Sequence, residues 1–170
     1  MFDILLNTPF WAYLVLLFLG YHGIKACSPT QESKNSLIFS PLVLLAWAAL
    51  ALDFSADPTL LIGVGIAALL LGSLLGMIVF STRGVELDDP ENGLIVPGTV
   101  KTLVFYLLLF VANYYFGYQN DVHPENATSL EMLTLKAGAA GLAVGIFSGR
   151  SLKFYRLFRS LKARRAATAL

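Results

Sequence analysis

The chain is poor in the residues that build covalent and metal-centred chemistry. It contains one cysteine, Cys27, and two histidines, His22 and His123, among 170 residues. A single cysteine excludes an intrachain disulfide, a four-cysteine metal site and a paired-thiol redox mechanism. We expect the two histidines to lie about a membrane thickness apart, so they cannot jointly ligate a metal or haem within one protomer. The sequence therefore predicts no cofactor and no metal site.

Charged residues are also scarce, at 14% of the chain against 56% hydrophobic residues. Most acidic residues are scattered, and the exception is a short group of Glu86, Asp88, Asp89 and Glu91 that we interpret as a solvated turn. Acyl or phosphoryl transfer requires a cluster of acids, bases or metal ligands. An enzyme is therefore the least favoured function class, and no catalytic residue is predicted.

Long apolar runs dominate what remains. Five are long enough to cross a bilayer, at residues 9–27, 36–54, 59–80, 100–118 and 130–149. As helices they cover about 28 to 33 Å at 1.5 Å per residue, which matches a hydrocarbon layer of about 30 Å. Little sequence is left for a soluble domain. We predict an all-α polytopic bundle of five transmembrane helices that forms a single domain over residues 1–170.

Basic residues collect in alternate segments between these spans. Lys25 and Lys34 lie between spans one and two, and Arg83 and Lys101 flank the linker between spans three and four. Further basic residues follow span five, whereas the intervening segments carry acidic residues and neither lysine nor arginine. By the positive-inside rule the N-terminus is outside and the C-terminus is cytoplasmic.

The linker STRGVELDDPENGLIVPG predicts a short cytoplasmic hairpin between spans three and four. Residues 84–87 and 93–96 are extended runs on either side of a polar turn. Asn92-Gly93 is a hairpin signal, and Pro97-Gly98 ends the second run before span four.

Small residues recur four apart on two of the spans, which predicts close helix packing. They are Gly141, Gly145 and Gly149 on span five, and Ala68, Gly72 and Gly76 on span three. Such faces let backbones approach closely in lipid, where the hydrophobic effect drives little association. The partner face can belong to the same protomer or to a second copy, and the sequence leaves both open.

Lys136 is the basic residue that breaks the charge pattern, about two turns inside the outer end of span five. A charge at this depth marks a functional site by default, although lysine can also snorkel to the interface. Asn113 and Asp53 are expected at a comparable depth. We therefore predict a candidate polar cluster of Lys136, Asn113 and Asp53.

The tail at residues 150–170 predicts an amphipathic basic helix. Its regularly spaced charges are Arg150, Lys153, Arg156, Arg159 and Lys162. Lysine and arginine attract anionic lipids, while apolar residues between them, such as Phe154 and Phe158, insert at the interface. The expected partners are lipids of the anionic inner leaflet, with a second copy or another membrane protein also possible and no nucleic acid expected.

The linker motif resembles that of small bacterial inner-membrane proteins with four or five spans and a domain of unknown function. The matching residues are Arg83, Gly84, Asn92, Gly93, Leu94, Val96, Pro97 and Gly98. The resemblance implies a multi-pass protein of the bacterial cytoplasmic (inner) membrane and carries no activity with it.

Two further function classes follow from these features. Lys136 and the glycine faces favour an oligomeric transport or permeation protein, in which Lys136 would bind an anion or change protonation. The hairpin and the basic tail instead favour a non-catalytic accessory or sensor subunit that docks a partner. A polar cavity that reaches Lys136 would support transport, and an exposed cytoplasmic patch on a dry protomer would support the accessory role.

Overall fold

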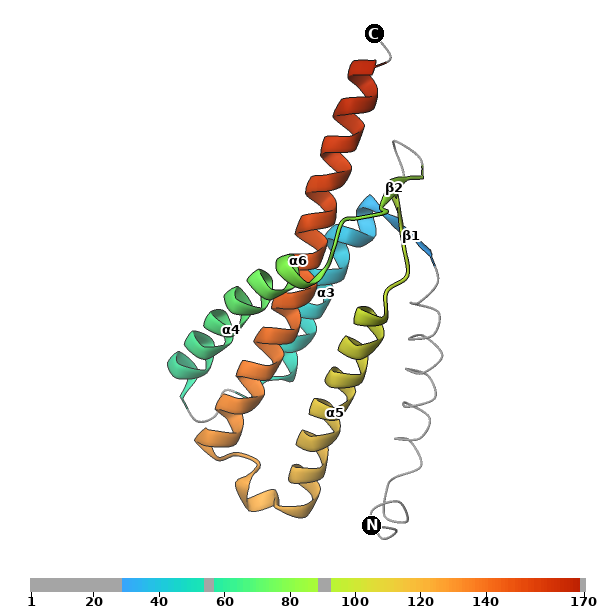
Figure 1. Ribbon diagram of the computed structural model, residues 1–170. Coiled ribbons are helices and arrows are strands. Elements are labelled where there is room, and N and C mark those ends of the chain that lie inside the picture. Colours follow the sequence, from blue (N-terminus) through green and yellow to red (C-terminus); the bar gives the residue numbers. More distant parts are fainter. Residues whose placement is uncertain (1–28, 54–56, 89–92, 169–170) are drawn as a thin grey trace, which may run out of the picture.

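The computed structural model describes residues 29–53, 57–88 and 93–168, which are mostly helical (Figure 1). The helices are α3 (Lys34–Ala51), α4 (Pro58–Val79), α5 (Val100–Val122) and α6 (Leu130–Thr168), with a 3₁₀-helix, η1 (Pro124–Asn126), before α6. The strands are β1 (Thr30–Ser33), β2 (Glu86–Leu87) and β3 (Gly93–Val96). The predicted span at residues 9–27 lies outside the described residues.

Three of these helices, α4, α5 and α6, are long and apolar enough to cross a membrane, and α3 is a shorter apolar helix. Their apolar side chains point largely outward. Trp47, Leu50 and Ile78 expose 75%, 87% and 77% of their surface. This arrangement is consistent with a membrane protein, while the number of spans and their orientation stay predictions.

Local capping explains where two of the helices begin. The Ser33 hydroxyl accepts a hydrogen bond from the Ser36 amide at 3.2 Å, before α3. The Asp57 carboxylate accepts from the amides of Thr59 and Leu60 at 3.0 and 3.2 Å, before α4. Pro58 occupies the first turn of α4, where an amide donor is not needed.

Helix α6 contains both the span predicted at 130–149 and the predicted basic tail helix, in one uninterrupted helix of 39 residues. The sequence prediction does not say whether the two are continuous. No proline interrupts the chain after Gly149, and the lysines, arginines and leucines that follow are good helix formers. The span and the tail are therefore one rod, whose C-terminal part extends beyond the other described elements (Figure 1).

The three strands form an antiparallel sheet in the order β1-β3-β2. Thr30 pairs with Val96, and Glu86 pairs with Ile95. The β2–β3 hairpin agrees with the predicted linker, whereas β1 is an addition that the sequence did not predict. At Gly93 a Cβ atom would overlap the backbone of Glu32, so glycine lets β1 and β3 come together.

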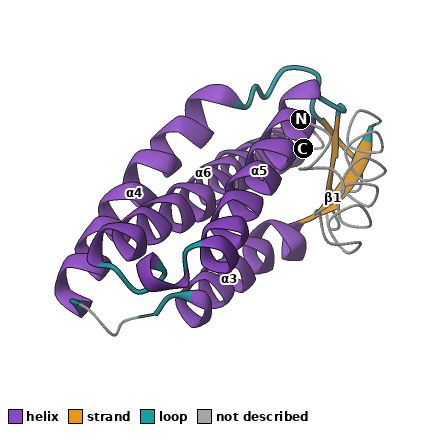
Figure 2. Cartoon of the chain, turned by 90° about the horizontal axis from the view of Figure 1, so that it is seen from below, coloured by secondary structure: helices purple, strands orange, loops and turns teal. Residues whose placement is uncertain are grey.

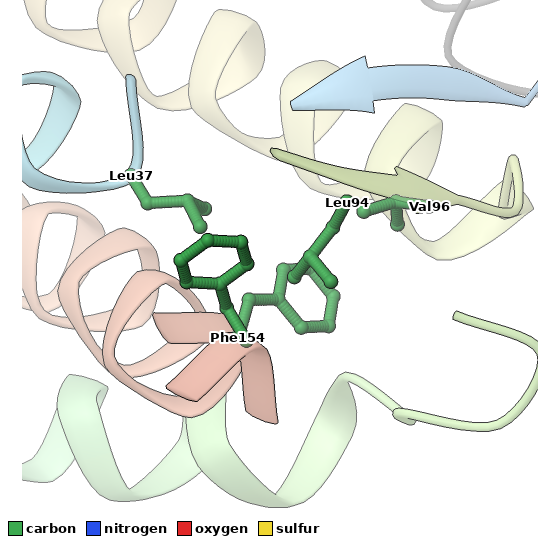
Figure 3. Packing of buried hydrophobic residues seen from close by; sticks show 5 residues of the cluster. Leu37, Leu94, Val96 and Phe154 are labelled. Atoms are coloured by element: carbon green, nitrogen blue, oxygen red, sulfur yellow. The ribbon is translucent and has the colours of Figure 1, made fainter. Parts of the chain in front are cut away.

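Two groups of buried side chains hold the helices and the sheet together. Leu61 of α4 packs against Leu133 and Ala137 of α6. The second group joins the sheet to α3 and α6, as Figure 3 shows, through Leu37, Leu94, Val96, Phe154 and Phe158. Viewed along the bundle, the strands lie at one side of the helices (Figure 2). Because β1 leads into α3 and β3 leads into α5, the sheet holds the N-terminal ends of these helices near the middle of α6.

Candidate functional site

A polar cavity lies in the region where α4 ends, α5 begins and the sheet meets α6, and Figure 1 shows how these elements are arranged. Arg150, Lys153 and Lys101 gather here, together with Glu32 of β1. We call this region the basic end of the bundle. Each of these charged groups has a defined partner.

Arg150 and Glu32 form a bidentate ion pair between α6 and β1. The Nη1 atom of Arg150 donates to Oε2 of Glu32 at 3.3 Å, and Nη2 donates to Oε1. The two side chains are only 15% and 19% exposed. The guanidinium also lies over the rings of Phe80 and Phe154, at 5.5 and 4.7 Å from their centroids. Because fork-shaped pairing fixes geometry as well as charge, this contact holds β1 in one position on α6.

Two lysines bind the C-terminal end of α4. The ammonium of Lys153 donates to the carbonyls of Met77 and Phe80, both at 2.6 Å. The ammonium of Lys101 donates to the carbonyl of Val79 at 2.9 Å. The last carbonyls of a helix lack intrahelical donors and carry partial negative charge. The lysines satisfy them and join α5 and α6 to the end of α4.

A cavity of about 240 Å³ opens beside the ion pair. Its polar lining residues are Thr30, Glu32, Ser81, Thr99, Lys101, Thr102, Tyr106 and Arg150, and its aromatic ones are Phe80, Phe105, Phe147 and Phe154. Glu32 offsets the charge of Arg150, so the lining carries one net positive charge from Lys101. Several residues with hydroxyl groups line the same cavity, and this composition suits a singly charged anionic group.

The basic tail divides into an inner and an outer part. Arg150 and Lys153 contact protein, which corrects the predicted lipid contact for these two residues. Phe154 and Phe158 do not insert at a membrane interface either, because the sheet and α3 cover them and leave them 2% and 5% exposed. Arg156, Arg159 and Lys162 lie on the outer part of α6, residues 156–168, where their side chains are exposed and remain available to a partner.

The side chains of Lys136, Asn113 and Asp53 do not form the predicted polar cluster, because Lys136 and Asn113 bond to other groups. Its ammonium donates to the side-chain oxygen of Asn120 on α5 at 2.8 Å. Asn113 donates to the carbonyl of Leu109 in its own helix at 2.9 Å. Lys136 and Asn113 do line one cavity of about 190 Å³, but alanines, leucines and Phe116 make up the rest of its wall. Lys136 therefore ties the α5–α6 hairpin together near its loop, and Asp53, which is exposed, does not line that cavity.

The predicted glycine faces lie between α4 and α6. A Cβ atom on Gly72 or Gly76 would overlap the backbone of α6, and one on Gly141, Gly145 or Gly149 would overlap the backbone of α4. Ala68 takes part in the same contact, because its Cβ atom would lie 3.1 Å from a methyl group placed on Gly141. Of the two alternatives that the sequence leaves open, these faces meet within the protomer.

The loop between α5 and α6 contains a second, exposed pair. His123 Nδ1 lies 3.2 Å from Oε1 of Glu125, with the two side chains 50% and 65% exposed. A backbone hydrogen bond at Glu125, followed by the His123 contact, lowers the pKa of the carboxyl. Within the described ranges, no three His, Cys, Asp or Glu side chains gather as a metal site.

Sequence reasoning missed three participants: Glu32, Asn120 and the role of Lys101 as a helix cap. Glu32 lies 118 residues from Arg150, and its strand is short and polar, so no local pattern signals the pair. The cap could have been predicted for Lys101, because the start of span four lies at the same membrane depth as the end of span three.

Comparisons with family models, curated proteins and solved structures find no match, so the function must be inferred from these residues themselves.

Proposed function

We propose that the chain is a multi-pass accessory subunit of the bacterial cytoplasmic (inner) membrane, which docks an acidic protein partner through the outer part of α6. In this proposal the described helices and residues 9–27 supply five spans, the N-terminus is outside and the C-terminus is cytoplasmic. Supporting the orientation, the start of α3, the end of α4, the start of α5 and the C-terminal half of α6 all lie toward one end of the bundle (Figure 1). Lys34 and Lys101 belong to the first turns of α3 and α5, and Arg83 follows the end of α4. The bacterial location rests on the linker resemblance.

The observation that carries the proposal is the length of α6. Its 39 residues extend about 58 Å at 1.5 Å per residue, against about 30 Å for the hydrocarbon layer. If the apolar part spans the membrane, Arg164 stands about 20 Å beyond Arg150 along the helix. Charges are screened over about 8 Å at physiological salt. The outermost arginines are thus too far from the bilayer surface to act mainly on lipid headgroups.

The outer part of α6 also has the charge of a docking element. It carries Arg156, Arg159, Lys162, Arg164 and Arg165, and no acidic residue follows Glu131 in the helix. Residues 162–168 are exposed on every side. Basic side chains that none of the described elements covers are free to meet a surface of opposite charge, which accelerates association and selects the partner. An acidic protein surface matches this element.

A transport role has weaker support. It would need a polar route that passes Lys136, yet the cavity beside Lys136 is walled mainly by Ala139, Ala140, Ala143 and Leu52. The glycine faces that suggested an oligomer are occupied within the protomer. A second copy would therefore have to bind elsewhere.

Site-specific photo-crosslinking in intact cells tests the proposal. A crosslinker at Ala163 should give protein adducts, and a crosslinker at Val111, which is 61% exposed on α5, should give lipid adducts as a control. Changing Arg159, Lys162, Arg164 and Arg165 to glutamine keeps helix propensity and removes charge. The Ala163 adducts should then disappear while the Val111 adducts persist. Adducts at Ala163 to lipid or nucleic acid alone, or protein adducts that survive neutralisation, contradict the proposal.

The orientation makes a separate prediction. With Cys27 replaced by serine, a cysteine placed at Asn120 should react with a membrane-impermeant thiol reagent from outside the cell. A cysteine at Thr168 should react only after the membrane is opened, because the basic segments favour the cytoplasmic side. Labelling of both positions from the same side would rule out the proposed topology.

A further inference from the structure

A second cavity continues from the one beside Arg150 and has a different character. It encloses about 670 Å³ between α4 and α5, on the surface of α6, and shares Phe80, Lys101 and Phe105 with the first cavity. Its remaining lining residues are Leu75, Val79, Val100, Val104, Leu108, Leu109, Ala112, Ala139, Leu142, Ala143 and Ile146. Lys101 is thus the sole charged residue of the apolar cavity and stands at its junction with the polar one.

The packing of α5 explains why this groove exists. Near the basic end, α5 contacts α6 through Phe147, whose ring lies 5.1 Å from that of Phe105 and 6.0 Å from that of Tyr106. Farther along, the facing residues include Ala112, Ala139 and Ala143, which are too small to fill the space between the helices. None of the described residues of α5 is buried. An apolar channel is left open along α5.

The groove has the depth of one lipid leaflet. It follows α5 from Val100 to Ala112, a rise of about 18 Å at 1.5 Å per residue. Half of a hydrocarbon layer is about 15 Å. The groove therefore begins at the level where α4 ends and α5 begins and reaches about to the membrane midplane, as an acyl chain does.

The polar cavity at the mouth of the groove suits a headgroup with one negative charge. An ammonium has three N–H donors, and the Val79 carbonyl takes one of those of Lys101. Glu32 already compensates Arg150. The uncompensated charge is that of Lys101, and Thr99 and Thr102, whose hydroxyl groups lie 3.1 Å from each other, line the same cavity. A phosphodiester carries the matching single charge and acceptor oxygens.

We propose that the two cavities together bind one anionic glycerophospholipid. Its phosphate is bound by Lys101 and the neighbouring hydroxyl groups, and an acyl chain lies along the groove between α4 and α5. The site is distinct from the outer part of α6, and it does not depend on the partner proposed for that segment.

Lipid retention by the full-length protein tests this site. The protein is reconstituted in nanodiscs that contain equal amounts of phosphatidylglycerol and phosphatidylcholine, and the lipids that stay bound after transfer to detergent are counted by native mass spectrometry. Lys101→Gln should reduce phosphatidylglycerol retention about fivefold. This change corresponds to the ~1 kcal/mol that one basic residue contributes to the binding of anionic lipid. Lys34→Gln makes the same change at an exposed residue that lines neither cavity, and should have no effect.

A second variant tests the acyl-chain part of the site. Ala112→Phe fills the groove without touching Lys101 and should also reduce retention, whereas Ala163→Phe on the outer part of α6 should not. Circular dichroism verifies that the variants keep their helices. Equal retention of the two lipids by the unmodified protein, or unchanged retention in either Lys101→Gln or Ala112→Phe, would overturn the proposal. So would displacement of the lipid by glycerol 3-phosphate at equal concentration, since the headgroup alone would then suffice.

Discussion

Replacing Gly145 by alanine is expected to lower the free energy of unfolding by about 2 kcal/mol, the cost of overpacking a tight contact. The added methyl group would overlap the carbonyl oxygen of Leu69 and lie 2.9 Å from the Cα atom of Gly72 and from the amide nitrogen of Ser73. These are backbone atoms, which cannot rotate away as a flexible side chain can. Helices α4 and α6 must therefore separate, and Gly145→Leu should separate them further.

Gly138→Ala is a matched control on the same helix. A Cβ atom there meets only Val64 Cγ1, at 3.6 Å, which is an ordinary van der Waals distance. Alanine also favours helix by about 1 kcal/mol over glycine, so this variant should be neutral or slightly stabilised. Denaturant titration in detergent micelles gives both free energies. Equal stabilities for the two variants would show that α4 and α6 are not in close backbone contact.

The sequence predicts the described helices well because a membrane span needs a long apolar run, and such runs are local. The predicted spans 59–80 and 100–118 correspond to α4 and α5, which begin at Pro58 and Val100. The small residues four apart also lie together for a local reason, since residues i and i+4 share a helix face. What the spacing leaves open is which neighbour the face meets, and only the three-dimensional arrangement answers that.

The candidate polar cluster shows the limit of reasoning from depth. Counting residues along a helix gives the level of Lys136 in the bundle, but not the direction of its side chain around the helix. Asn120 lies about two turns closer than Asn113 to the α5–α6 loop, and Lys136 donates its hydrogen bond there. A lysine near a helix end reaches in this way toward polar groups at the interface.

The prediction that Phe154 and Phe158 insert at the membrane interface is wrong for a related reason. Periodicity identifies Phe154 and Phe158 as one apolar face, but does not say what covers that face. In a membrane protein lipid is the first candidate. Here β3 contributes Leu94 and Val96, and α3 contributes Leu37, so protein covers the face instead. The strands are too short, and their partners too distant in sequence, for local patterns to predict this cover.

Arg150→Met is expected to destabilise the protein by about 2 kcal/mol. Removing one partner of a fully buried ion pair costs about 3 to 5 kcal/mol, because the other charge stays desolvated. The expected loss is smaller here because Glu32 and Arg150 retain 19% and 15% exposure. Contacts of the guanidinium with the rings of Phe80 and Phe154 are lost as well. Arg156→Met, on the exposed face of the same helix, should leave the free energy of unfolding nearly unchanged.

A double-mutant cycle separates the ion pair from the packing of the arginine. Glu32→Gln removes the charge that Arg150→Met would strand, so the double variant should be destabilised by less than the sum of the two single variants. The shortfall measures the coupling between the side chains. Since the pair joins β1 to α6, limited proteolysis near residues 29–33 should also become faster in Arg150→Met and not in Arg156→Met. Additive losses in the cycle, with unchanged proteolysis, would mean that the sheet is held by Leu94, Val96 and Phe154 alone and that the ion pair contributes no net stability.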